Sequence, residues 1–151
     1  MLQGRITPGQ EKDYILAGKA VFTVQNTETG GRFTFQVVKA KPYAGQSPDQ
    51  APWFVKVLTG PDNTWFSYLG VIWGNKNTGT YRHGRKSRIL KSAPSSKAFR
   101  WLWHAVNNGG LPNKVKLYHE GKCGRCGRRL TVPKSIITGF GPECRSILGI
   151  H

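Results

Sequence analysis

The chain has 151 residues, of which 38% are hydrophobic, and its 23 Lys and Arg residues against 7 Asp and Glu residues give a formal net charge of +16. This length and apolar content favour one folded domain, with at most a small metal-stabilised appendage, and argue against a globally disordered chain. The sequence has no apolar run of membrane-spanning length and no signal-peptide pattern, so we expect no membrane partner.

Four segments are predicted to be β-strands, because apolar residues alternate in them with polar ones or because aromatic and β-branched residues dominate. These segments are residues 20–24, 32–37, 53–58 and 65–73. Their short connections favour an antiparallel meander. Gly70, inside the fourth segment, indicates a bulge or a bend of the kind that curls a sheet. A turn is expected at residues 60–63, Gly-Pro-Asp-Asn.

One helix is predicted from Pro94 to about Asn107, with proline in its first turn and two glycines after its end. Its apolar residues form one broad arc, with Trp101 and Trp103 at opposite margins, so this helix should cover one face of the sheet. The predicted fold class is α+β, with a curled antiparallel sheet (meander or partial barrel), one covering helix and a C-terminal zinc knuckle. The expected parts are a flexible leader at 1–12, a sheet-and-helix domain at 13–110 and a zinc-knuckle domain at 111–151.

The positive charge is concentrated in the second half of the chain. Residues 1–80 hold 8 basic and 5 acidic residues, whereas residues 81–151 hold 15 and 2. Such density implies a polyanionic partner, with nucleic acid (DNA or RNA) first. The run at residues 80–91 combines arginines, whose planar guanidinium groups can bind phosphate through two hydrogen bonds, with an aromatic ring that can stack on a base. A solvated loop without a ligand can have the same composition. The candidate contacts in this run are Tyr81, Arg82, Arg85, Lys86, Arg88 and Lys91.

A structural zinc site is predicted near the end of the chain, from His119, Cys123, Cys126 and Cys144. A Cys-x-x-Cys sequence lets two thiolates reach one ion from a single tight turn. Cys144 follows a Gly-Pro pair that favours a helix start, where the helix dipole stabilises a thiolate. His119 ends an alternating run at 115–119. Four protein ligands would form a closed tetrahedral site for Zn²⁺, or for iron in its place.

The sequence supports a disulfide or a redox site at these cysteines less well than a zinc site. A disulfide would leave one of three cysteines over, and a redox Cys-x-x-Cys would need a βαβ context that this sequence lacks. His119 is the weakest of the four ligands, because a lone histidine beside apolar positions is often a packed side chain. His151, His104 or His83 could take its place.

The segment from Cys123 to Ser135, followed by Gly-Phe-Gly-Pro-Glu-Cys at 139–144, resembles a zinc-knuckle domain of unknown function. That domain recurs at the C-terminus of small bacteriophage-encoded proteins, as a knuckle with one histidine and three cysteines. The runs at 58–63 and 81–87 are also similar to members of that group. The resemblance implies a phage origin and the cytoplasm of an infected bacterial host, and it implies no catalytic residue and no settled activity.

The positions between the knuckle ligands are themselves cationic. Repulsion among these side chains destabilises the fold unless an anion is present, so they are also candidate nucleic-acid contacts. They are Lys122, Arg125, Arg128, Arg129 and Lys134.

Three functions are therefore considered. The first is a nucleic-acid-binding protein, with single-stranded DNA or RNA favoured over duplex because aromatic residues are plentiful and no recognition helix is evident. The second is a protein–protein module that binds and modulates an acidic host factor such as a nuclease, a polymerase or a defence protein. The third is a metal-dependent nuclease that uses His83. Because the carboxylates are scattered and no nucleophile–base set can be assembled, the sequence favours a protein that is not an enzyme.

Overall fold

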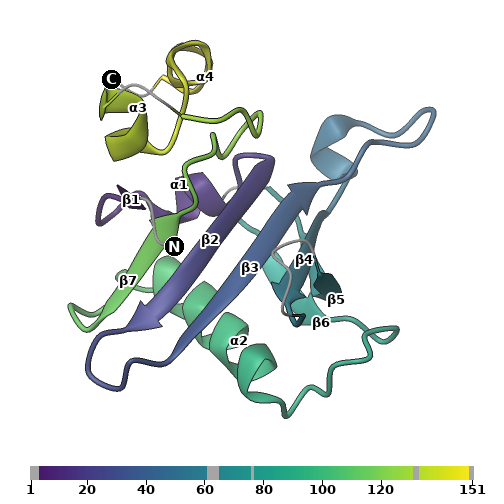
Figure 1. Cartoon of the computed structure of the whole chain (residues 1–151). Helices are drawn as coiled ribbons and strands as arrows, with labels where there is room; N and C mark the ends of the chain where they lie inside the picture. Colours follow the sequence, from purple (N-terminus) through teal and green to yellow (C-terminus); the bar gives the residue numbers. More distant parts are fainter. Residues whose placement is uncertain (1–3, 61–64, 76, 131–132, 150–151) are drawn as a thin grey trace.

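A single curled antiparallel sheet of seven strands forms the body of the molecule in the computed structural model, which describes residues 4–60, 65–75, 77–130 and 133–149 (Figure 1). The strands lie in the order β1-β7-β2-β3-β4-β5-β6. Their bounds are Gly4–Arg5 (β1), Lys19–Asn26 (β2), Arg32–Lys39 (β3), Trp53–Leu58 (β4), Phe66–Trp73 (β5), Thr80–His83 (β6) and Val115–His119 (β7). The predicted fold class is confirmed as a curled antiparallel sheet with helices and a C-terminal cluster of three cysteines, as are the four strands expected from alternation.

The two faces of the sheet differ in burial. On one face the alternate residues of β2 and β3, such as Phe22, Phe35 and Val37, are 0% exposed. Val55 of β4 and Ile72 of β5 continue this core at 0% exposed. Because successive side chains of a strand point to opposite faces, the residues between them lie on the other face, where most are half-buried or exposed.

The bulge expected at Gly70 is present. Val55 pairs with Gly70, but the next residue, Lys56, pairs with Tyr68, so Leu69 is the extra residue of β5. A bulge increases local twist, which curls the sheet. A side chain at Gly70 would also collide with the backbone carbonyl of Arg82, so the close approach of β6 requires glycine here.

Helix α2 (Pro94–Asn107) covers the core face, as predicted (Figure 1). Phe99 and Leu102 are 0% exposed, and the Phe99 ring lies 5.1 Å from that of Phe35. The other helices are short: α1 (Glu11–Ile15), the 3₁₀ turn η1 (Pro48–Gln50), α3 (Pro133–Thr138) and α4 (Pro142–Leu148). Within the described ranges, no helix has the length and apolar character needed to cross a bilayer.

The structure corrects two predicted boundaries. The predicted leader at 1–12 is not a loose segment in its described part, because β1 pairs with β7 and Ile6 is 2% exposed. A boundary after residue 110 does not match the topology either, because β7 lies between β1 and β2 in the sheet. β6 is a further strand that alternation did not reveal, since it has only four residues. The turn predicted at 60–63 lies, apart from Gly60, outside the described residues.

Candidate metal centre and cationic surface

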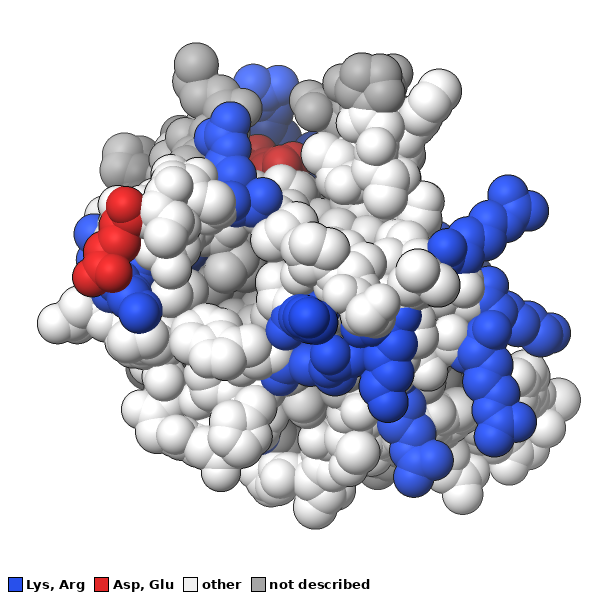
Figure 2. All heavy atoms as spheres, turned by 90° about the horizontal axis from the view of Figure 1, so that it is seen from below, with Lys and Arg blue, Asp and Glu red and all other residues white. Residues whose placement is uncertain are grey.

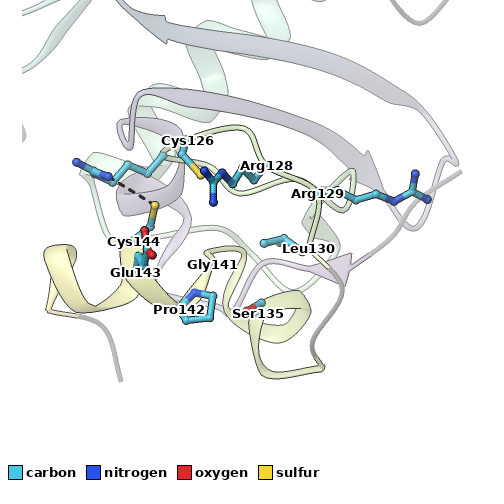
Figure 3. Close-up of a pocket in the computed structure, with 10 residues that line it drawn as sticks. Cys126, Arg128, Arg129, Leu130, Ser135, Gly141, Pro142, Glu143 and Cys144 are labelled. Atoms are coloured by element: carbon cyan, nitrogen blue, oxygen red, sulfur yellow. Dashed lines mark hydrogen bonds between the residues drawn. The ribbon is translucent and has the colours of Figure 1, made fainter.

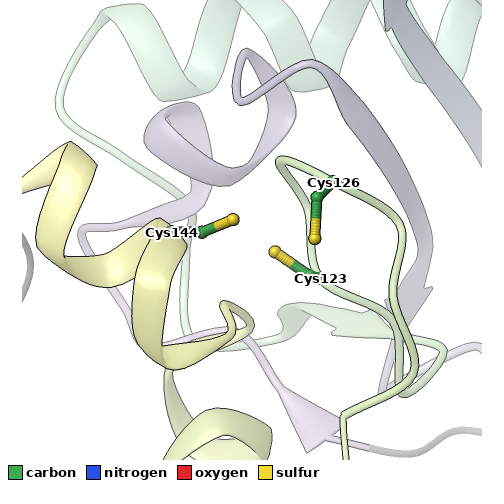
Figure 4. A group of neighbouring side chains, drawn as sticks. All are labelled: Cys123, Cys126 and Cys144. Atoms are coloured by element: carbon green, nitrogen blue, oxygen red, sulfur yellow. The ribbon is translucent and has the colours of Figure 1, made fainter.

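The three cysteines converge on one point although they come from two separate segments (Figure 4). Cys123 and Cys126 lie on the turn after β7, and Cys144 lies in the first turn of α4. Their sulfur atoms all lie within 4.8 Å of one another. The turn closes because the Gly127 N–H donates to the Cys123 carbonyl at 2.9 Å, with Gly127 at φ 79°, a conformation that favours glycine.

This arrangement fits a metal ion better than a disulfide. All three thiols are free, and sulfurs within 4.8 Å of one another are close enough to share one ion whose Zn–S bonds are about 2.3 Å long. Cysteine thiolates are preferred ligands of Zn²⁺, and Fe–S chemistry uses the same donors. The described residues therefore supply three ligands of a possible metal site. When bound, such an ion would cross-link the turn after β7 to α4.

The surroundings of Cys123 favour its thiolate, whereas the pKa of the Cys144 thiol is raised overall. Burial acts to raise the pKa of the Cys123 thiol, but backbone N–H groups of Gly141, Cys126 and Arg125 outweigh it and lower this pKa below its ordinary value. Burial raises the pKa of the Cys144 thiol, while the Arg125 guanidinium, whose Nη1 donates to Cys144 Sγ at 3.6 Å, acts in the opposite direction. Three thiolates around Zn²⁺ carry one net negative charge, which Arg125 is placed to offset.

His119 is not part of this cluster, and its predicted role as a metal ligand requires correction. The ring is 0% exposed, and both of its nitrogens are already hydrogen-bonded to the backbone. Nδ1 accepts from the Gly121 N–H at 3.0 Å, and Nε2 lies 2.5 Å from the Ile136 carbonyl oxygen, to which it donates. Neither nitrogen has a lone pair left for a metal. His119 instead joins the end of β7 to α3.

Among the described residues, the other histidines considered as substitutes do not join the cluster. His104 is exposed on α2, and His83 of β6 forms a hydrogen bond through Nε2 with the Ile89 carbonyl at 2.9 Å. His151 lies outside the described residues. Within the described ranges, no fourth histidine, cysteine or carboxylate joins the three sulfurs. The Nδ1 atom of His83 is buried without a hydrogen-bond partner, so its basic nitrogen faces inward.

The described residues at 120–130 and 133–149, which we call the C-terminal unit, are attached to one end of the sheet (Figure 1). Tyr14 of α1 makes the central contact, since its hydroxyl donates to the Lys122 carbonyl at 3.1 Å and its ring lies 5.6 Å from that of Phe140. Gly124 lies against the Tyr14 ring, where a Cβ atom would come within 2.6 Å of a ring carbon. Tyr14 is a residue of this site that the sequence analysis missed, because a single tyrosine in a five-residue helix carries no pattern.

A pocket of about 360 Å³ opens beside the cysteines (Figure 3). Its walls include Arg125, Arg128 and Arg129 together with Ser135, whose hydroxyl is buried and has no hydrogen-bond partner. Glu143 also lines the pocket, from the exposed first turn of α4. Three of the five predicted cations of the knuckle thus line one hollow, although Arg129 extends away from the two cysteines that line it (Figure 3). Lys122 and Lys134 are exposed and do not line it.

The second predicted group of cations lies elsewhere. Arg82 lies on β6. The other four cations lie on the loop from residue 84 to 93, which we call the basic loop. The whole group is Arg82, Arg85, Lys86, Arg88 and Lys91, and their side chains lie at the surface. In Figure 1 this loop and the C-terminal unit are at opposite ends of the sheet, so the two groups of cations do not form one patch. Seen from beneath, lysine and arginine side chains gather over the centre and right of the face, with few acidic ones (Figure 2).

Tyr81, which was expected to stack on a base, and the two tryptophans at the margins of the α2 arc differ in burial. Tyr81 faces the core, where its ring lies 4.8 Å from that of Phe99 and its hydroxyl is buried, so the expected base contact is not supported. Burial also raises the Tyr81 pKa well above its ordinary value. Trp103 is buried and donates through Nε1 to the Gly79 carbonyl at 3.2 Å. Trp101, by contrast, is 44% exposed.

Ser96 fixes the basic loop to α2, and its replacement by alanine is expected to lower the free energy of unfolding by about 1–2 kcal/mol. The side chain is 0% exposed and its hydroxyl donates to the Leu90 carbonyl at 2.7 Å, so the variant leaves a buried acceptor without a donor. Urea denaturation measures the difference, with Ser95→Ala as the matched control on the same helical turn. Equal stability of the two variants would contradict this role for Ser96.

The comparisons with known proteins add one match. A family of unknown function, DUF6011, matches residues 118–149, which include the three cysteines, α3 and α4. The comparisons with curated proteins and with solved structures give no match. The C-terminal unit is therefore similar to an uncharacterised family.

Proposed function

We propose that this chain is a nucleic-acid-binding protein whose cationic C-terminal unit is held in shape by zinc. The observation that carries the proposal is the pocket beside the cysteines. Three arginines line it, and their guanidinium groups are donors that a phosphate accepts. The net charge of +16 supports a polyanionic partner in general, and the pocket supports phosphate in particular.

Zinc has a structural role in this proposal. Cys123, Cys126 and Cys144 would hold the ion, which would fix Arg125 and Arg128 on a turn too short to hold its shape by packing alone. Ordered cations lose less conformational entropy on binding than mobile ones, which makes each phosphate contact stronger. The proposal assigns no catalytic residue.

Arg128→Gln combined with Arg129→Gln is expected to weaken oligonucleotide binding about tenfold near physiological salt. Both side chains lie at the surface and line the pocket, so their removal affects binding without opening the core. The slope of log K against log salt concentration should fall by about 0.7 for each lost contact with a single strand. Fluorescence anisotropy with labelled oligonucleotides at several salt concentrations measures both quantities.

The matched control is Lys41→Gln combined with Lys114→Gln, which removes the same charge from exposed positions outside the pocket. If the two double variants lose affinity equally, net charge rather than the pocket governs binding. If wild-type affinity does not change between low and physiological salt, the proposed function is wrong.

We also propose a phage-encoded origin and the cytoplasm of an infected bacterium as the place of action. The support is the resemblance of residues 123–144 to a zinc knuckle of small phage proteins, together with the family match at 118–149. Imaging a tagged copy during infection tests the location, and retention of the protein outside the host cytoplasm would contradict it.

A second candidate function is docking on an acidic host protein, and one observation favours it. Three aliphatic side chains of the C-terminal unit are exposed, at 64% for Ile137, 63% for Ile147 and 41% for Leu148. Exposed apolar side chains among cations are common at protein interfaces. Affinity capture from host lysate with and without nuclease digestion separates the two functions. A protein partner that survives digestion and is lost in Ile147→Ser would support docking.

A further inference from the structure

The face of the sheet opposite α2 combines exposed aromatic rings with cations. Phe54 of β4 is 39% exposed and Trp73 of β5 is 47% exposed. Phe54 pairs with Val71, two residues before Trp73, so the two rings lie on one face in adjacent rows of the sheet. Tyr68 lies on the same face and its ring contacts that of Phe54 edge to face, with centroids 6.3 Å apart. This contact holds the Phe54 ring in place.

The charge on this face has one sign. The seven strands contain no Asp or Glu. Alternation from the paired positions places six of their Lys and Arg residues on the face opposite α2. These residues are Arg5, Lys19, Arg32, Lys56, Arg82 and Lys116. We call this surface, with Phe54 and Trp73, the open face. It is complementary in charge to a phosphate backbone and in shape to unstacked bases.

The open face also connects the two separate groups of cations. One row of paired residues runs across the sheet from Lys19 through Val38, Phe54 and Val71 to Arg82. At one end, the Lys19 N–H donates to the Gly124 carbonyl of the C-terminal unit at 2.7 Å. At the other end, β6 continues into the basic loop. Four strand spacings of about 4.8 Å make this row about 19 Å long, which is within reach of a few nucleotides.

We propose that the open face binds single-stranded nucleic acid, with bases stacked on Phe54 and Trp73 and the backbone running between the C-terminal unit and the basic loop. This inference rests on the proposed function and adds strandedness and a path. A duplex keeps its bases stacked on one another, so its bases cannot reach exposed rings on a sheet. Lys56 and Arg82 lie beside the two rings and are the expected phosphate contacts.

The test compares Phe54→Leu combined with Trp73→Leu against Trp101→Leu, which removes an exposed ring from α2. Leucine keeps apolar character and removes the ring. Binding of a labelled single-stranded oligothymidylate is measured by anisotropy, beside its duplex with oligodeoxyadenylate. The Phe54 and Trp73 variant is expected to lose about 5- to 100-fold in affinity, and the Trp101 variant less than about twofold. Wild-type protein should bind the single strand more tightly than the duplex.

Photo-crosslinking of wild-type protein to an oligomer that contains 4-thiothymidine gives a second readout that no folding defect can affect. Crosslinked peptides are expected to include residues 53–58 and 66–73. The inference is overturned if the single strand and the duplex bind equally, if only Trp101→Leu weakens binding, or if crosslinks map to α2 alone. If the arginine pair at 128 and 129 still matters in those cases, the proposed function stands without this inference. If wild-type protein binds no oligonucleotide, both fail.

Discussion

Cys126→Ser is expected to release the bound zinc and to unfold the C-terminal unit. Metal content should fall from about one ion per chain to a small fraction of that, because two remaining thiolates cannot hold Zn²⁺ against solvent. The unit has short stretches of regular structure and few buried apolar residues of its own, so much of its folding energy must come from the metal. Metal analysis and limited proteolysis measure the two effects.

The control is Ile147→Ser on α4, whose side chain is 63% exposed and outside the cluster. It should keep the metal and resist proteolysis like the wild type. The sheet should remain folded in Cys126→Ser, because Phe22, Phe35 and Phe99 pack against one another in its core. A Cys126→Ser protein that retains its metal and its resistance to protease would show that these cysteines are not the site of a structural ion.

The sequence could predict those strands, helices and motifs that are marked by residues close together along the chain. Phe33, Phe35 and Val37 alternate with polar residues, and this spacing gives both the strand and the face that is buried. Pro94 marks the start of α2, and Gly109 follows its end at φ 100°. The spacing of the cysteines, with Pro142 before Cys144, was likewise enough to predict that they meet.

The elements that the sequence could not predict depend on pairing between distant segments. β1 has two residues, and only its partner β7, far along the chain, makes it a strand. β7 was expected to lead into a separate domain, yet its place beside β2 is fixed by contacts that no local pattern encodes. A count of charges also does not tell where charged side chains lie on the fold. The sequence therefore could not show that the basic loop and the C-terminal unit lie at opposite ends of the sheet (Figure 1).

His119 shows how a correct pattern can support a wrong role. Its spacing from Cys123 is typical of a zinc ligand, and its place at the end of an alternating strand puts it on the same side as Val115 and Leu117. The backbone groups of Gly121 and Ile136, which occupy both ring nitrogens, come from a turn and from a helix that was not predicted. A ligand and a buried hydrogen-bonding side chain are therefore indistinguishable at the level of spacing.

His119→Ala is expected to lower the free energy of unfolding by about 2–5 kcal/mol while leaving the metal content unchanged. The variant removes a side chain that is 0% exposed and that fills the space between Gly4 and Tyr14, which leaves a cavity. It also leaves the Gly121 N–H and the Ile136 carbonyl without partners. Urea denaturation measures stability, and metal analysis of the folded fraction measures the ion.

Two further variants separate packing from ligation. His104→Ala removes an exposed histidine of α2 and should change neither quantity. His119→Gln keeps an amide that can replace one of the two hydrogen bonds, so it should recover part of the stability and still bind metal, because the three thiolates are intact. If His119→Gln instead loses its metal while its sheet remains as stable as that of the wild type, then His119 ligates the ion when the metal is bound, and the hydrogen bonds to Gly121 and Ile136 belong to the metal-free form.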